Sequence, residues 1–162
     1  MYKEASAVLY GSNIFNLVET TEKQPDLLHS FLACIGPSNS GALTHLCIKF
    51  PGVEKAQDRT QRYKLTEESL RSLNLLKQEC TCLKTLELFI HSQNASGLTQ
   101  VIQDSPTLAT EALSQIKAQL NTIGSLVNII VRVYDRGLNL SLERSMQGLG
   151  WTVLRGDEMA HG

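Results

Sequence analysis

The 162-residue sequence has no excess of charge of either sign and no long hydrophobic run. Its 15 lysines and arginines nearly balance its 16 aspartates and glutamates, which leaves a net charge of −1. Nucleic acid and anionic membrane surfaces are bound through concentrated basic patches, so we expect neither as a partner. A membrane-spanning helix or a secretory signal requires an apolar run, and we expect neither in this chain.

Motifs that announce catalysis are also missing. The sequence contains no G-x-S-x-G, no H-E-x-x-H and no G-x-G-x-x-G. The small residues from Gly36 to Gly41 follow a predicted helix and precede a predicted strand, which is the reverse of a phosphate-binding loop. We therefore expect no cofactor, and although an enzyme is not excluded, a non-catalytic role is favoured.

Cysteine is scarce, and the four cysteines, Cys34, Cys47, Cys80 and Cys82, lie within hydrophobic patterns. Without a secretory signal we expect reduced thiols in an intracellular protein, cytoplasmic or nuclear. Cys80 and Cys82, with His91 and with His45 or Cys47 from a neighbouring strand, could be drawn as a zinc site. The C-x-C spacing is not one that structural zinc sites use, so we expect no bound metal.

Hydrophobic spacing predicts helices and strands in strict alternation along a single domain, residues 1–162. The predicted helices cover residues 2–10, 25–35, 67–80, 106–123 and 140–150. The predicted strands cover residues 13–18, 43–50, 83–91, 126–135 and 151–155. We expect a loop at 38–42, a mobile loop at 52–64, where mixed charges have no apolar period, and a frayed tail at 156–162. The alternation predicts an α/β fold with a mainly parallel sheet.

The three central strands share the pattern L-x-x-L-x-L. It is formed by Leu43, Leu46 and Ile48, by Leu83, Leu86 and Leu88, and by Leu126, Ile129 and Val131. A fixed apolar pattern that recurs at this period is typical of stacked repeats. We therefore expect a leucine-rich-repeat-like arc, with the strands in register and the helices on one face.

The intervening strand residues point to the opposite face of the sheet, because side chains alternate along a strand. They are mostly polar or aromatic, whereas a parallel sheet covered on both faces would be hydrophobic there too. We interpret this face as open, with the candidate binding residues His45, Lys49, Glu87, Phe89, His91, Asn128, Arg132 and Tyr134. Alternatively, a partner or other structure covers it, which Phe89 and Ile130 would suit.

Two segments resemble a group of filamentous-fungal proteins, many of which begin with an F-box-like L-P-x-E-I-R module. The segment MYKEASAVLYGSNIFN resembles the C-R-x-I-Y-x-E-A…L-Y-G-x-N-x-F motif of the group. The segment FLACIGPSNSGALTHLCIKFP is similar to the helix, turn and strand that follow it. Together the two segments cover roughly the first third of the chain.

The resemblance implies that the chain corresponds to the C-terminal part of a longer family member and lacks the F-box-like module. Met1 stands where the group has an aliphatic residue inside a helix. We then expect exposed apolar surface near Val8, Leu9 and Ile14. We also expect the strand that includes residues 14–18 to form an unprotected sheet edge, through which the chain could self-associate.

Two functions follow as hypotheses, and a third interpretation is a fragment with no independent function. The favoured one is a non-catalytic interaction module that binds a segment of a partner protein, with Phe89 and Tyr134 as anchors and Lys49, Glu87 and Arg132 for orientation. The other is a small intracellular enzyme or ligand-binding domain with a pocket at the C-terminal ends of the strands. In that case Glu87, His91 and Arg132 could carry out acid–base chemistry.

Overall fold

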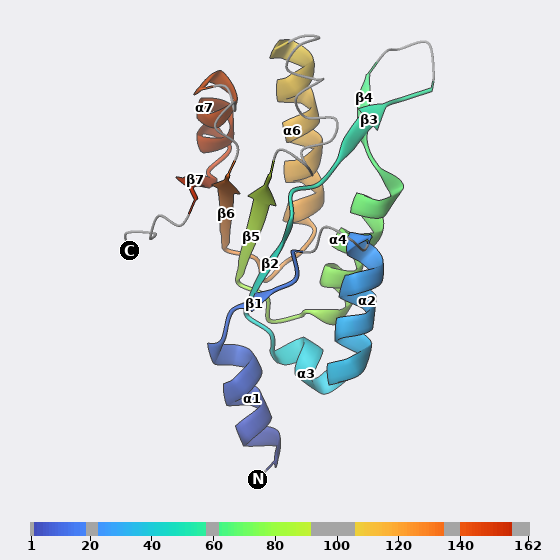
Figure 1. The fold of residues 1–162 in the computed structure, drawn as a ribbon, viewed down its shortest axis with the longest axis vertical. Coiled ribbons are helices and arrows are strands. Elements are labelled where there is room, and N and C mark those ends of the chain that lie inside the picture. The colour runs from blue at the N-terminus through green and yellow to red at the C-terminus, as the bar shows by residue number, and fades with distance from the viewer. Residues whose placement is uncertain (1, 19–22, 58–61, 92–105, 135–139, 157–162) are drawn as a thin grey trace.

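The computed structural model describes residues 2–18, 23–57, 62–91, 106–134 and 140–156, which form an α/β structure around one main sheet (Figure 1). Five parallel strands make up this sheet, in the order β1-β2-β5-β6-β7. Their bounds are β1 Phe15–Asn16, β2 His45–Lys49, β5 Thr85–Ile90, β6 Asn128–Val133 and β7 Thr152–Arg155. The predicted fold class is therefore confirmed.

The register of the three central strands is the one that the leucine pattern predicts. Leu46 of β2 lies opposite Leu86 of β5, and Leu86 lies opposite Ile129 of β6. One row across the sheet thus contains the same position of all three repeats. This row faces the hydrophobic core, where Leu46 and Leu86 are completely buried.

Helices connect the strands, and local sequence signals explain where several of them begin and end. Their bounds are α1 Tyr2–Ser12, α2 Gln24–Ile35, α3 Pro37–Ala42, α4 Glu67–Glu79, α6 Pro106–Asn121 and α7 Leu140–Gly148. Pro25 lies in the first turn of α2, where its missing N–H has no helical partner to lose, and Gly36 ends α2 with a φ of 85°. Thr66 caps α4 by accepting a hydrogen bond from the backbone N–H of Ser69.

The helices between the strands pack on one face of the sheet. Each crossover adds a strand on the same side of the preceding one, and right-handed crossovers in one direction place their helices on one face. The helices form a continuous row, in which α2 contacts α4, α4 contacts α6 and α6 contacts α7. Leu28, Leu76 and Leu113 extend from this row into the core, where all three are completely buried.

The segment 52–64, expected to be a mobile loop without helix or strand, contains a β-hairpin. Strand β3, Val53–Lys55, pairs antiparallel with β4, Tyr63–Leu65. The side chains of Val53, Tyr63 and Leu65 are buried in the main core, and the Gln115 side chain of α6 donates a hydrogen bond to the Tyr63 carbonyl at 2.8 Å. Three apolar residues therefore fix a segment whose other side chains are charged or polar. Residues 58–61 lie outside the described residues.

The segment 38–42 is a second correction, because it forms most of the short helix α3 rather than a loop. Pro37 begins this helix, and the buried Ser40 hydroxyl donates to the Leu32 and Gly36 carbonyls at the end of α2. Because the Ser40 side chain satisfies carbonyl groups that the end of α2 leaves without helical partners, a second helix can follow directly. The expected frayed tail lies outside the described residues, except for Gly156.

The edge strand β1 is shorter than the predicted strand and is only two residues long. After β1 ends, the Gln24 side chain links the two segments: it accepts a hydrogen bond from the Lys49 N–H at 2.9 Å and donates one to the Leu17 carbonyl at 3.1 Å. Because β1 has only two residues, this edge offers little backbone for pairing with another chain. The predicted apolar exposure is confirmed at Val8, Leu9 and Ile14.

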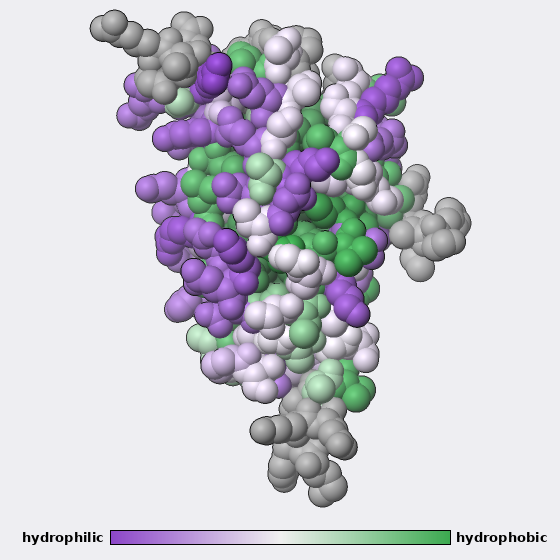
Figure 2. Space-filling model, turned by 180° about the vertical axis from the view of Figure 1, so that it is seen from behind, coloured by the Kyte–Doolittle hydropathy of each residue, from purple (hydrophilic) through white to green (hydrophobic). Residues whose placement is uncertain are grey.

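Polar and apolar residues are unevenly distributed over the surface. On the side of the molecule opposite the view of Figure 1, hydrophilic residues gather along one margin and hydrophobic residues occupy much of the centre (Figure 2). In the part of the chain that the structure describes, no helix is long and apolar enough to cross a membrane.

Candidate functional site

The centre of the non-helical face of the sheet is a buried carboxylate, Glu87. It lies on the middle strand β5, opposite Cys47 of β2 and Ile130 of β6. Glu87 is only 4% exposed, although it points away from the leucine row formed by its neighbours in the chain. A buried charge is costly unless it is paired and hydrogen-bonded, so its partners determine the chemistry of the face.

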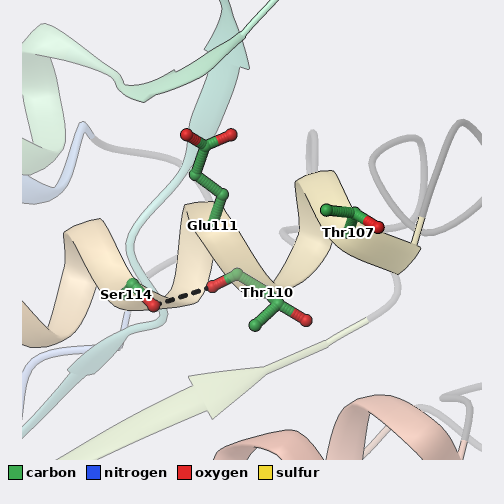
Figure 3. Close-up of a pocket in the computed structure, with 4 residues that line it drawn as sticks. All are labelled: Thr107, Thr110, Glu111 and Ser114. Carbon is green, nitrogen blue, oxygen red and sulfur yellow. Dashed lines mark hydrogen bonds between the residues drawn. The ribbon is translucent and has the colours of Figure 1, made fainter.

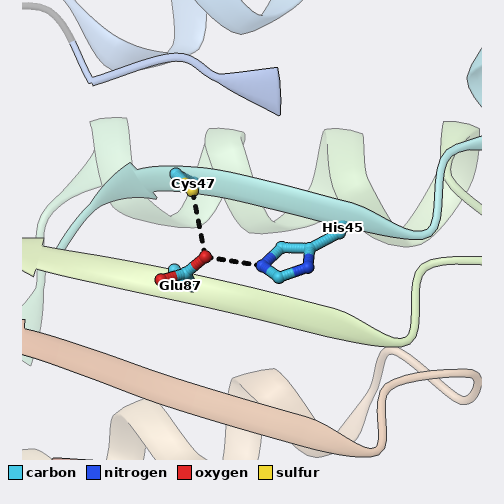
Figure 4. Close-up of side chains that lie close together, drawn as sticks. All are labelled: His45, Cys47 and Glu87. Carbon is cyan, nitrogen blue, oxygen red and sulfur yellow. Dashed lines mark hydrogen bonds and ion pairs between the residues drawn. The ribbon is translucent and has the colours of Figure 1, made fainter. Parts of the chain in front are cut away.

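Three side chains satisfy the two carboxylate oxygens of Glu87. His45 Nε2 lies 2.6 Å from Oε2, and the Cys47 thiol donates to the same oxygen at 3.4 Å (Figure 4). Arg132 Nε of β6 donates to Oε1, and Arg132 Nη1 donates to the Gly156 carbonyl at 3.2 Å. Because an ionised carboxylate only accepts, His45 must carry its hydrogen on Nε2 in this arrangement.

These contacts hold Glu87 in its ionised form. The hydrogen bond from His45, followed by the hydrogen bond and charge of Arg132, lowers the pKa of Glu87 to about 2, against the opposing effect of burial. Burial and the neighbouring Glu87 charge raise the pKa of the Cys47 thiol to about 12. At neutral pH the site therefore contains a carboxylate and a neutral thiol.

A second cluster, which we call the aromatic cluster, consists of Phe89, His91 and Tyr134 at the carboxyl end of β5 and β6. The His91 and Tyr134 rings are stacked, with centroids 4.6 Å apart and planes at 3°. Phe89 lies beside them on the same face, with its ring centroid 5.5 Å from that of Tyr134 and 6.2 Å from that of His91. Phe89 is buried, His91 is half-buried and Tyr134 is 36% exposed, so the cluster is packed on one side and accessible on the other.

The structure places the other predicted face residues at the margins of the face. Lys49 ends β2, and Asn128 begins β6, where its side chain donates to Thr85 Oγ1 at 3.4 Å. The face is less open than predicted, because Glu87 and Phe89 are both buried. The hypothetical acid–base trio is also divided: Arg132 contacts Glu87, whereas His91 belongs to the aromatic cluster, where its ring contacts Phe89 and Tyr134.

The zinc arrangement drawn around Cys80 and Cys82 does not form. Cys80 is buried at the end of α4 and Cys82 is exposed in the following turn. Among the described residues, the one set of three potential ligand atoms that lie within 4.8 Å of one another comes from His45, Cys47 and Glu87. The alternation of side chains along β2 and the strand register already place these three residues on one face, which is the signal that sequence reasoning could have used.

One pocket lies on α6 (Figure 3). It is lined by Thr107, Thr110, Glu111 and Ser114, and the Ser114 hydroxyl donates to the Thr110 carbonyl within the same helix. Among the described residues, the lining comes from α6 alone.

Comparisons with known proteins give no match to this chain: no family model, no curated protein and no solved structure matches it.

Proposed function

We propose that this chain is a non-catalytic interaction module that binds a segment of a partner protein on the sheet face opposite the helices. The observation that carries the proposal is the aromatic cluster. Aromatic rings that are packed against one another and partly accessible offer a large contact area and lose little conformational freedom on binding. Tyr134 would be the principal anchor, with the buried Phe89 packed beside it.

The charged centre of the face supports binding rather than catalysis. A general acid or base works best with a pKa near the working pH, whereas the pKa of Glu87 is about 2. A cysteine nucleophile reacts as a thiolate, whereas the pKa of Cys47 is about 12. Glu87 and Arg132 instead form a fixed pattern of charge, which together with Lys49 would orient a bound segment.

The resemblance to the fungal F-box-like group is compatible with this role. We propose that the chain belongs to this group and acts inside the cell, in the cytoplasm or nucleus. The cysteines support this location, since Cys34, Cys47, Cys80 and Cys82 form no disulfide. Self-association through the β1 edge remains a further prediction, which the oligomeric state of the purified chain would test.

A peptide-display selection on the purified chain tests the proposed function. We expect enriched peptides whose affinity falls at least about tenfold in Tyr134→Ala, which corresponds to about 1.4 kcal/mol. The matched control is Lys77→Ala, at an exposed position in the last turn of α4, which should leave the affinity unchanged. Failure to enrich any peptide, or peptides that bind Tyr134→Ala as tightly as the unmodified chain, would contradict the proposal.

A further inference from the structure

We propose that His45, Cys47 and Glu87 form a zinc-binding site in the centre of the sheet. The three residues supply an imidazole, a thiol and a carboxylate, which are the three protein ligand types that zinc uses. Their ligand atoms all lie within 4.8 Å of one another in the structure (Figure 4). This inference goes beyond the proposed function and replaces the sequence-based expectation of no metal.

One of the three ligand-atom distances already fits a tetrahedral zinc site, and a second requires a small movement of His45. With Zn–S of about 2.3 Å and Zn–O of about 2.1 Å, a tetrahedral angle separates sulfur from oxygen by about 3.6 Å. The distance between Cys47 Sγ and Glu87 Oε2 is 3.4 Å. His45 Nε2, now 2.6 Å from Oε2, must move away to about 3.3 Å. The His45 side chain is 24% exposed, so it has space to make this movement.

Arg132 prepares the carboxylate for this role. It donates to Oε1, so Oε2, the oxygen that already faces His45 and Cys47, is the one available to the ion. Orientation of a metal ligand by a hydrogen-bonding partner is a general property of zinc sites. The thiolate and the carboxylate together supply two negative charges, so the ion, its two anionic ligands and Arg132 carry a net charge of +1.

The proton balance of the site is defined. Zinc replaces the hydrogen on Cys47 Sγ, which leaves to solvent, and binds the lone pair of His45 Nε2 while the ring hydrogen moves to Nδ1. One proton is therefore released for each ion bound. Three protein ligands leave a fourth position for water or for a side chain of a partner, on the side of the sheet without helices.

Cobalt(II) is a suitable probe, because its spectrum reports both thiolate ligation and four-coordination. The chain is reduced, stripped with a chelator and titrated with cobalt(II), and then zinc is added. We expect a thiolate-to-cobalt charge-transfer band that saturates at one ion per chain and disappears when one equivalent of zinc is added. The absence of this band at saturating cobalt would overturn the proposal.

Variants assign the ligands. Cys47→Ser retains a hydroxyl beside Glu87, and we expect it to lose the band and to bind zinc at least about a hundredfold more weakly. His45→Gln retains an N–H donor toward Glu87 and should bind at least about tenfold more weakly. The matched control, Cys34→Ser with Cys82→Ser, removes the two exposed thiols and should leave the band unchanged. A band that survives in Cys47→Ser or disappears in the control would refute the assignment.

Discussion

The two faces of the sheet are buried by opposite means, as Leu86 and Glu87 illustrate. These neighbours on β5 are 0% and 4% exposed. Leu86 lies in a row of aliphatic side chains beneath the helices, where burial of apolar surface supplies the free energy. Glu87 lies on the other face, where it is buried only because His45, Cys47 and Arg132 satisfy its oxygens. One face therefore stabilises the fold by apolar packing, whereas burial on the other face depends on the hydrogen-bond partners of each polar side chain.

The largest effect is expected on the helix-covered face. Leu86→Ala removes a completely buried side chain from the centre of the repeat row and should lower the free energy of unfolding by about 2–5 kcal/mol. Urea denaturation measures the change. Lys84→Ala, at an exposed position next to the same strand, is the control and should change stability by less than about 0.5 kcal/mol. Equal effects of the two substitutions would contradict the assignment of the core.

On the polar face, Glu87→Gln should cost about 2–3 kcal/mol at pH 7, because it leaves Arg132 without its carboxylate. The folded-state pKa of about 2 lies below the ordinary value of 4.5, so the unmodified chain should lose stability as the pH falls from about 4.5 through 2. Unfolding free energies measured across this range should fall less steeply in Glu87→Gln. The same slope in both chains would show that Glu87 is not held in its ionised form.

A smaller effect is expected at the start of α4, within the helix layer. Thr66→Ala removes the side-chain cap that accepts from the Ser69 N–H at 3.2 Å, and should cost about 1 kcal/mol. Thr66→Ser retains the capping oxygen and should recover most of that loss. If Thr66→Ser is as unstable as Thr66→Ala in urea, the lost stability comes from the methyl group rather than from the cap.

The smallest perturbation is chemical labelling of the thiols, which changes no residue. Cys34 and Cys82 are exposed and should react rapidly with a disulfide reagent in the folded chain. Cys47 lies on the polar face beside Glu87, and Cys80 lies in the hydrophobic core. Burial raises the pKa of each thiol to about 12, so both should react only after unfolding. Mass spectrometry of the labelled peptides identifies each site, and early labelling of Cys47 would contradict the closed network.

Much of the fold follows from local patterns. The leucine repeat predicts the register of β2, β5 and β6, because the same L-x-x-L-x-L spacing recurs in all three strands and its equivalent positions lie opposite one another. The β3–β4 hairpin could not be predicted in this way, since Val53, Tyr63 and Leu65 are isolated among polar residues and become a core only against α6. A non-local contact of this kind leaves no period in the sequence.

The candidate site was predictable in its position but not in its pairing. Alternation along the strands places Glu87 and Arg132 on one face, and the structure confirms that they meet. Whether the carboxylate pairs with His45 or with His91 depends on side-chain reach, and the structure selects His45. The burial of Glu87 also depends on how the side chains pack, which cannot be derived from the spacing of residues in the sequence.

The most direct test of the central claim, that the non-helical face is the binding face, compares two neighbouring isoleucines. Ile129 packs against the core beneath the helices, whereas Ile130 lies beside Glu87 on the other face. With the methyl groups of Ile129 and Ile130 labelled for NMR, a peptide from the display selection is titrated into the chain. We predict that the Ile130 methyl signal shifts while that of Ile129 stays in place. A larger shift at Ile129, or no shift at either methyl group while the peptide is bound, would contradict the account.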